Sequence, residues 1–249
     1  MEDNKLKLYR VKDKNESYTI KKRLLFNIPF RLLLNAKSGV GKTSFIVWLL
    51  LNKNKECYKD NFKGDNIYIF SPSIHTDYKL NVLISNLDIP DHNLFESLDM
   101  DMLEAVYEMI KEDYSEKIRN KEKPENTLII IDDCMDALKN GGKKNILDKM
   151  AANCRHQQCS FIISSQYYNK FPPTVRSNAN GVVIWDTSDK ILEQIAEEHS
   201  TISHKAFKKM FRDNTNDNNY SFIIINYTNK KKERYLNDKF EVIDINKYE

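Results

Sequence analysis

The stretch RLLLNAKSGVGKTSFIVWLL, residues 31–50, decides the fold, because an apolar run leads through a glycine-containing turn into a second apolar run. Within it, AKSGVGKT matches the phosphate-binding pattern GxxxxGK[ST], except that Ala36 replaces the first glycine, which costs little if its φ is negative. In such loops backbone N–H groups hold phosphates, the lysine neutralises their charge and the threonine binds Mg²⁺. We therefore expect ATP to bind Ser38, Gly39, Val40, Gly41, Lys42, Thr43 and Ser44. A chance turn with a solvated lysine is the alternative.

Short apolar runs alternate with longer helix-like segments along most of the chain. The runs lack polar alternation, which is typical of strands covered on both faces. Strand–helix alternation predicts an α/β fold, with a mainly parallel sheet flanked by helices. The expected strands are 30–35, 66–71, 127–132, 160–165 and 181–185, and the expected helices are 42–52, 77–86, 99–120, 144–156 and 189–199.

Length and composition suit one large domain. The chain has 249 residues, of which 41% are hydrophobic and 30% charged, so a disordered chain is excluded. We expect a flexible arm over 1–20, a phosphate-loop ATPase core over 21–205, and a C-terminal β extension over 206–249. A hairpin in this extension would pair 220–227 with 233–236. The formal charge of +3 neither demands nor excludes nucleic acid.

The sequence also bears on compartment. The longest apolar run, 45–51, is too short to span a bilayer, and the first residues lack the apolar core of a signal peptide. The four cysteines show no CxxC spacing, so neither a zinc site nor a disulfide framework is indicated. We therefore expect an intracellular protein in a reducing compartment.

Two carboxylates follow the most apolar strand, LIII at 128–131. Asp132 would bind Mg²⁺ and Asp133 would polarise the attacking water. Because adjacent side chains of an extended segment point opposite ways, we expect their roles to differ. A strand followed by an acidic helix cap is the alternative.

A polar amide, Gln166, ends the next strand of the chain. In phosphate-loop ATPases with a second acidic residue, that strand is inserted between the loop strand and the acidic strand. Gln166 would then sense the γ-phosphate or orient water, as glutamine does elsewhere in phosphoryl transfer. An ordinary loop-facing glutamine is the alternative.

Basic segments offer candidate contacts to DNA phosphates. Lys139, Lys143 and Lys144 follow the acidic strand in a glycine-containing stretch. The turn 230–232 combines three lysines with nearby Arg234, Tyr227 and Tyr235, so cations and base-stacking aromatics are mixed there. Solvated, lysine-rich loops are the alternative in both places.

Four segments together resemble a known family: AKSGVGKT, IFSPS after the second strand, IIIDD, and CRHQQCSFIISSQ. They are similar to those of the DNA-packaging ATPases of large cytoplasmic DNA viruses and virophages, in the FtsK–HerA superfamily. The resemblance spans roughly residues 28–190 and implies a RecA-like fold. Ala36 departs from the family's pattern in the phosphate loop. Asp133 also departs from it, because many relatives have glutamate where this chain has Asp133. The resemblance implies functional roles for Lys42, Thr43, Asp132, Asp133, Gln166 and Arg155.

The function expected from the resemblance is ATP-driven translocation of double-stranded DNA into a capsid. It implies a homo-oligomeric ring, pentamer or hexamer, a capsid vertex or portal partner, no membrane partner, and location in the host cytoplasm or with the virion. Two alternatives stay open: a phosphate-loop kinase of a small metabolite, and an assembly factor that binds ATP without hydrolysing it. The kinase would need an arginine-bearing lid, and the assembly factor would need neither Asp133 nor Gln166.

Arg155 precedes the strand that ends in Gln166. At ~3.3 Å per residue, that strand would place Arg155 roughly 20 Å from its own nucleotide. Arg155 would therefore serve a neighbouring subunit as an arginine finger, a role that stabilises charge in phosphoryl transfer. Arg176 is the rival candidate, and capping of the preceding helix is the alternative role for Arg155.

Overall fold

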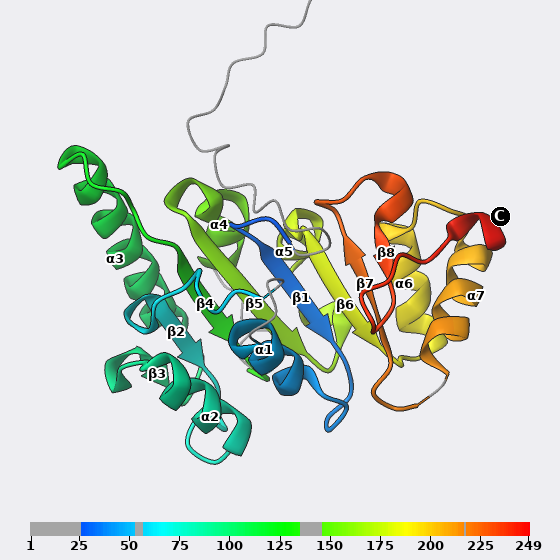
Figure 1. Cartoon of the computed structure of the whole chain (residues 1–249), viewed down its shortest axis with the longest axis horizontal. Coiled ribbons are helices and arrows are strands. Elements are labelled where there is room, and N and C mark those ends of the chain that lie inside the picture. Colours follow the sequence, from blue (N-terminus) through cyan, green and yellow to red (C-terminus); the bar gives the residue numbers. More distant parts are fainter. Residues whose placement is uncertain (1–25, 53–56, 135–145, 217) are drawn as a thin grey trace, which may run out of the picture.

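One eight-stranded sheet forms the centre of the described part of the protein, a computed structural model that describes residues 26–52, 57–134, 146–216 and 218–249 (Figure 1). The strand order is β3-β2-β4-β5-β1-β6-β7-β8. The strands are β1 (Arg31–Asn35), β2 (Ile67–Phe70), β3 (Leu94–Phe95), β4 (Thr127–Ile131), β5 (Cys159–Ser165), β6 (Gly181–Trp185), β7 (Phe222–Asn226) and β8 (Tyr235–Leu236).

The strands from β3 through β6 in this order run parallel, whereas β7 and β8 are antiparallel to their neighbours. β5 lies between the loop strand β1 and the acidic strand β4, so the predicted insertion is confirmed. The parallel strands end at one common edge, which we call the C-terminal edge, and begin at the opposite, N-terminal edge. Because β7 runs backwards, its first residue Phe222 pairs with Trp185 at the C-terminal edge.

Helices cover both faces of the sheet. The helices are α1 (Lys42–Leu51), α2 (Tyr78–Leu87), α3 (Met100–Arg119), α4 (Ile146–Asn153), α5 (Pro173–Asn178), α6 (Asp189–His199) and α7 (His204–Thr215). α1 and α2 pack on one face, with α1 in front of the sheet in Figure 1, and the other helices pack on the opposite face. Strand residues alternate between the two cores: Leu33 and Ile129 join one, and Leu32 and Ile130 the other. The predicted mainly parallel α/β fold is confirmed.

Three elements were not expected from the sequence: β3, α5 and α7. α7 is a twelve-residue helix in the segment 206–249, where only β structure was expected. Its buried residues Ala206, Phe207, Met210 and Phe211 follow helical spacing, and the Ser203 side chain accepts a hydrogen bond from the Ala206 N–H. Lysines and asparagines between these positions hide the apolar stripe. The expected arm 1–20 and the start of the helix predicted over 144–156 lie outside the described residues.

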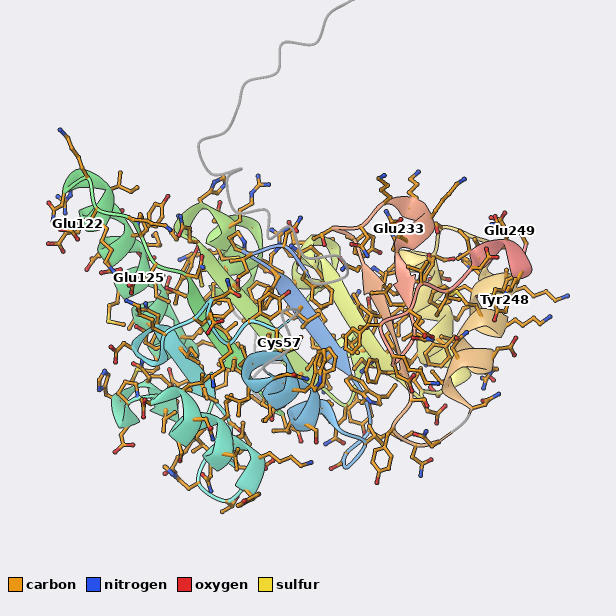
Figure 2. All side chains as sticks on the ribbon, viewed as in Figure 1. Cys57, Glu122, Glu125, Glu233, Tyr248 and Glu249 are labelled. Atoms are coloured by element: carbon orange, nitrogen blue, oxygen red, sulfur yellow. The ribbon has the colours of Figure 1, made fainter. Side chains whose placement is uncertain are left out.

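The phosphate loop and the turn between β7 and β8 lie at opposite edges of the sheet. The phosphate loop follows β1, and Asp132 follows β4, at the C-terminal edge. The turn between β7 and β8 lies at the N-terminal edge, where Figure 2 labels Glu233. Because the phosphate loop and Asp132 meet at the C-terminal edge, a nucleotide site is expected there, as in other open α/β sheets.

None of the described helices combines the length and apolar character needed to cross a bilayer.

Candidate nucleotide site

The phosphate loop turns sharply between β1 and α1. Ala36 continues the strand, with its N–H donating to the Ser165 carbonyl at 3.2 Å, and its φ is not positive, so alanine fits here. Gly39 and Gly41 have φ values of 79° and 109°, which side chains rarely adopt. Gly41 is the N-cap of α1 and accepts from the Phe45 N–H at 2.9 Å. The loop thus points the N-terminus of α1 at the site, as phosphate binding requires.

Lys42 lies inside this loop, with 6% of its surface exposed. Its Nζ donates to the backbone carbonyls of Ala36 at 3.0 Å and Lys37 at 3.1 Å. Burial lowers the pKa of Lys42, and the nearby Asp133 and Asp132 carboxylates oppose this effect. The ammonium group is therefore held at the loop by neutral acceptors that a phosphate would outcompete.

Asp132 is the most buried carboxylate of the site, with 2% of its surface exposed. It accepts hydrogen bonds from Thr43 Oγ1 at 3.0 Å and from Ser164 Oγ. Burial raises the pKa of Asp132, while the hydrogen bonds from Ser164 and Thr43 lower it. Asp132 therefore joins the start of α1 to the ends of β4 and β5.

Thr43 and Asp132 are suitable ligands for Mg²⁺. Both present oxygen atoms, which this hard cation prefers, and no cation among the described residues bonds directly to the buried carboxylate. The described residues contain no cluster of three or more His, Cys, Asp or Glu side chains that could hold a metal alone. Mg²⁺ usually takes one or two protein ligands and completes its shell with waters and phosphate oxygens.

Asp133 faces the same cavity as Asp132. The expectation that the two carboxylates point opposite ways is wrong, because Asp133 leaves the extended conformation with a φ of 57°. Aspartate tolerates this left-handed region better than most residues. Its N–H donates to Ser164 Oγ at 3.0 Å, and Gln166 Nε2 lies 3.3 Å from both of its carboxylate oxygens. The amide of Gln166 thus orients the Asp133 carboxylate.

A cavity of about 250 Å³ brings these groups together. Asp77 caps α2 by accepting from the Lys79 N–H at 2.8 Å, and both residues line the cavity together with Ser73. No motif indicated a role for these three residues, although they follow β2 and so belong to the same edge. Val40 and Ser44 line a second cavity beside the first. The first cavity is lined by Ser38, Gly39, Gly41, Lys42, Thr43, Ser73, Asp77, Lys79, Asp132 and Asp133.

The two candidate arginine fingers lie at the opposite edge. Arg155 is exposed in a 3₁₀ turn (Cys154–Gln157) before β5, and among the described residues no hydrogen bond or ion pair engages its side chain. Arg176, on α5, donates from Nε to Glu198 at 3.0 Å, and 13% of its side chain is exposed. Neither arginine reaches the nucleotide cavity of its own chain.

No described residue of the two basic segments lines this cavity. Lys139, Lys143 and Lys144 lie outside the described residues. In the lysine-rich turn, Tyr235 is 1% exposed and the Arg234 guanidinium covers the Tyr227 ring at 4.7 Å. The Tyr235 ring is therefore not available to stack on bases and one face of the Tyr227 ring is covered, while the lysines of 230–232 are exposed.

We expect Asp132→Asn to stabilise the unliganded protein at neutral pH. The raised pKa of Asp132 means that the folded state binds its proton more tightly than the unfolded state does. Its ionisation penalty is therefore full above the folded pKa and vanishes below the ordinary value. The stability gained by Asp132→Asn should shrink as pH falls, measured by urea unfolding from pH 3 to 8. The exposed control Asp60→Asn should show no such gain; a loss of stability at pH 7 in Asp132→Asn would contradict the argument.

Comparison with known proteins gives matches in sequence and in structure. The chain is 28% identical over 154 residues to "DNA packaging protein OPG160" of Variola virus and of Vaccinia virus strain Western Reserve. Each match covers 62% of this chain and 52% of the relative, so the chain spans about half the length of these curated relatives.

Among solved structures, the genome packaging NTPase B204 of Sulfolobus turreted icosahedral virus 2, in complex with AMP, matches with a TM-score of 0.55 and 18% identity. That match covers 80% of this chain and 93% of the other. The AMPPCP complex of the same NTPase matches with a TM-score of 0.53 and 18% identity, covering 80% and 92%. At this identity the likeness shows a common fold, and it confirms the predicted phosphate-loop NTPase architecture.

The family profile described as "Poxvirus A32 protein" matches residues 17–246, which is most of the chain. This agrees with the resemblance to viral DNA-packaging ATPases that the sequence motifs indicated. The protein belongs to the Poxvirus A32 protein family.

Proposed function

We propose that the protein is an ATP-driven double-stranded DNA translocase that packages a viral genome into a capsid as a ring of identical subunits. The observation that carries the proposal is the cavity at which residues of the phosphate loop, the Thr43–Asp132 pair and the Asp133 carboxylate meet. Membership in the A32 family and relatives named DNA packaging proteins support the packaging role.

The residues divide the reaction between them. The backbone of Gly39 and Gly41 and the ammonium group of Lys42 would hold the phosphates. Thr43 and Asp132 would hold Mg²⁺, which supplies positive charge to the phosphate oxygens when bound. Asp133, oriented by Gln166, would accept a proton from the attacking water.

Two other functions use parts of the same site. A small-metabolite kinase needs an acceptor pocket and an arginine-bearing lid over the phosphates, but Arg155 and Arg176 both lie at the far edge. A nucleotide-dependent assembly factor needs no base beside the γ-phosphate, and the hydrogen bonds between Gln166 and Asp133 at the cavity support such a base instead. Hydrolysis of ATP gives a role to Lys42, Thr43, Asp132 and Asp133, which all line the cavity.

The proposed assembly is a pentameric or hexameric ring around DNA, attached to a capsid vertex or portal component in the host cytoplasm or the virion. Its grip on DNA should be independent of sequence, because a translocating motor contacts every base pair in turn. The exposed lysines of 230–232 are the described candidates for phosphate contact. Lys139, Lys143 and Lys144 remain candidates from the sequence.

We expect double-stranded DNA to stimulate ATP hydrolysis by the full-length protein, equally for unrelated sequences. Binding should weaken steeply with salt, because each phosphate contact releases counterions. Steady-state phosphate release and DNA-binding titrations between about 50 and 200 mM salt measure both effects. A kinase would hydrolyse slowly without its acceptor, and an assembly factor hardly at all. A clear sequence preference or a flat salt response would contradict the translocase.

We expect Lys42→Ala to abolish nucleotide binding or hydrolysis, and Asp133→Asn to keep binding but lose turnover. Lys42 contacts phosphate in the ground state, whereas Asp133 acts only when water attacks. The loss of kcat in Asp133→Asn should be about 10²-fold or more. ATP affinity and kcat of both variants give the test, and near-wild-type kcat in Asp133→Asn would refute its role as base.

Arg155 is the stronger candidate for an arginine supplied to a neighbouring subunit. It is exposed and, within the described residues, unpaired, whereas Arg176 would have to break its ion pair with Glu198. No hydrogen bond from the Arg155 side chain to the end of α4 occurs among the described residues, so a capping role for Arg155 would rest on its charge alone. An arginine supplied in trans is worth ~10³-fold or more in rate.

We expect mixtures of Arg155→Ala and Lys42→Ala to recover part of the ATPase activity that each lacks alone. In mixed rings, an intact Lys42 site of one subunit would meet an intact Arg155 of its neighbour. The matched control is Lys42→Ala mixed with Asp133→Asn, because both changes damage the same site and no intact site forms. ATPase rates on confirmed mixed rings give the measurement. Recovery with Arg176→Ala but not with Arg155→Ala would assign the finger to Arg176.

A further inference from the structure

A second cavity, of about 460 Å³, opens directly beside the phosphate cavity. Gly39, Gly41 and Lys79 line both cavities, so the second begins where the phosphate cradle ends. Its volume lies in the range of sites that bind small molecules. A ligand anchored by phosphates in the first cavity would extend its other end into this one.

Aromatic side chains from distant parts of the chain form the walls. Phe45 and Trp48 come from α1, and Trp185 and Phe222 lie at the paired ends of β6 and β7. The rings brace each other: Phe45 meets Trp185 edge-on at 5.8 Å between centroids. Phe240 stacks on Trp48 at 4.5 Å, with 17° between their planes. The cleft is therefore a rigid aromatic surface.

Two polar features complete the cleft. Tyr220 also lines it and is 66% exposed, so its ring can cover a ligand. Asp238 lines the cavity and is half-buried. In the part of the chain that the structure describes, no hydrogen bond or ion pair engages its carboxylate. An ionised carboxylate only accepts hydrogen bonds, so the cleft offers an acceptor among apolar rings.

We propose that this aromatic cleft binds the adenine base of the nucleotide and that Asp238 accepts a hydrogen bond from the 6-amino group of the base. Flat rings next to a phosphate cradle suit a heterocyclic base, because stacking on aromatic side chains stabilises bound bases. The acceptor favours adenine over hypoxanthine or guanine, which carry a carbonyl oxygen at that position. The inference rests on the proposed nucleotide site and extends it to the choice of base.

The C-terminal segment then has a function that no motif in it indicates. Tyr220, Phe222, Asp238 and Phe240 all lie in the region predicted as a β extension. The antiparallel pairing of β7 with β6 brings this segment back to the C-terminal edge. The base would thus contact the start of β7 and the loop after β8, while the triphosphate would bind beside the loops that follow β1 and β4.

Intrinsic fluorescence tests the proposal on the full-length protein, because both tryptophans of the chain, Trp48 and Trp185, line the cleft. With Mg²⁺ present, ATP should change the tryptophan emission, whereas inorganic tripolyphosphate should bind without this change. We expect ATP to bind about tenfold or more tightly than tripolyphosphate, because only ATP gains the stacking contacts. Calorimetric titration supplies the affinities independently of fluorescence.

Variants separate the parts of the site. Tyr220→Ala should weaken ATP several-fold and leave tripolyphosphate unchanged, while the matched control Tyr78→Ala, a 79% exposed tyrosine outside the cleft, should alter neither. Wild-type protein should bind ATP about tenfold more tightly than inosine triphosphate, whose carbonyl oxygen would face the carboxylate. Asp238→Asn should remove most of this preference, because an amide can donate to that oxygen.

The outcomes are distinct. Equal affinity for ATP and tripolyphosphate, with unchanged emission, would overturn the base site while leaving the phosphate site intact. Equal affinity of the wild type for ATP and inosine triphosphate would overturn the role of Asp238. Emission that depends on protein concentration but not on ATP would assign the cleft to contact between copies of the chain. Failure of both ATP and tripolyphosphate to bind would overturn the proposed function itself, and the base site with it.

Discussion

The site depends on a buried carboxylate that holds three elements together. Asp132 accepts from Thr43 at the start of α1 and from Ser164 near the end of β5, while it extends β4 itself. This is possible only because β5 lies between β4 and β1. The register places Ile163 opposite Ile131, so the next residues, Ser164 and Asp132, are level. A slip by one residue would turn Ser164 to the other face of the sheet and separate the two groups.

The same constraint explains the unusual backbone beyond the strand. Ser164 also accepts from the Asp133 N–H, which holds Asp133 in a left-handed conformation. That conformation costs free energy, and such costs tend to persist at functional sites, where surrounding contacts determine the geometry. Here its effect is to bring a second carboxylate to the cavity that already contains the first. One serine thus sets the position of both acids, so the polar end of β5 matters as much as the acidic end of β4.

The sequence predicted what is contiguous and missed what the fold assembles. The phosphate loop, the acidic pair and Gln166 each follow a short apolar strand, and the strand order places the ends of these strands at neighbouring positions of one edge. Ser73 ends the segment IFSPS of the family resemblance, whereas Asp77 and Lys79 line the cavity through the position of the start of α2, which no local pattern reveals. The aromatic cleft joins α1 to residues about 175 positions later in the chain, through a reversed strand whose direction periodicity alone does not indicate. α7 was missed because lysines interrupt its apolar stripe.

The two edges of the sheet carry different sets of candidate functional residues. The groups that would touch a nucleotide lie at the C-terminal edge, whereas Arg155, Arg176 and the lysines of 230–232 lie at the N-terminal edge. Arg31, also at this edge, is half-buried and donates to the Ala151 carbonyl at 3.1 Å, so it braces α4. Arg155 has no such internal task among the described residues. An exposed cation that lies far from the nucleotide cavity of its own chain adds little to the stability of the fold. We therefore propose that its charge acts on a second molecule, either a neighbouring subunit with a triphosphate at its own C-terminal edge or the phosphate backbone of DNA.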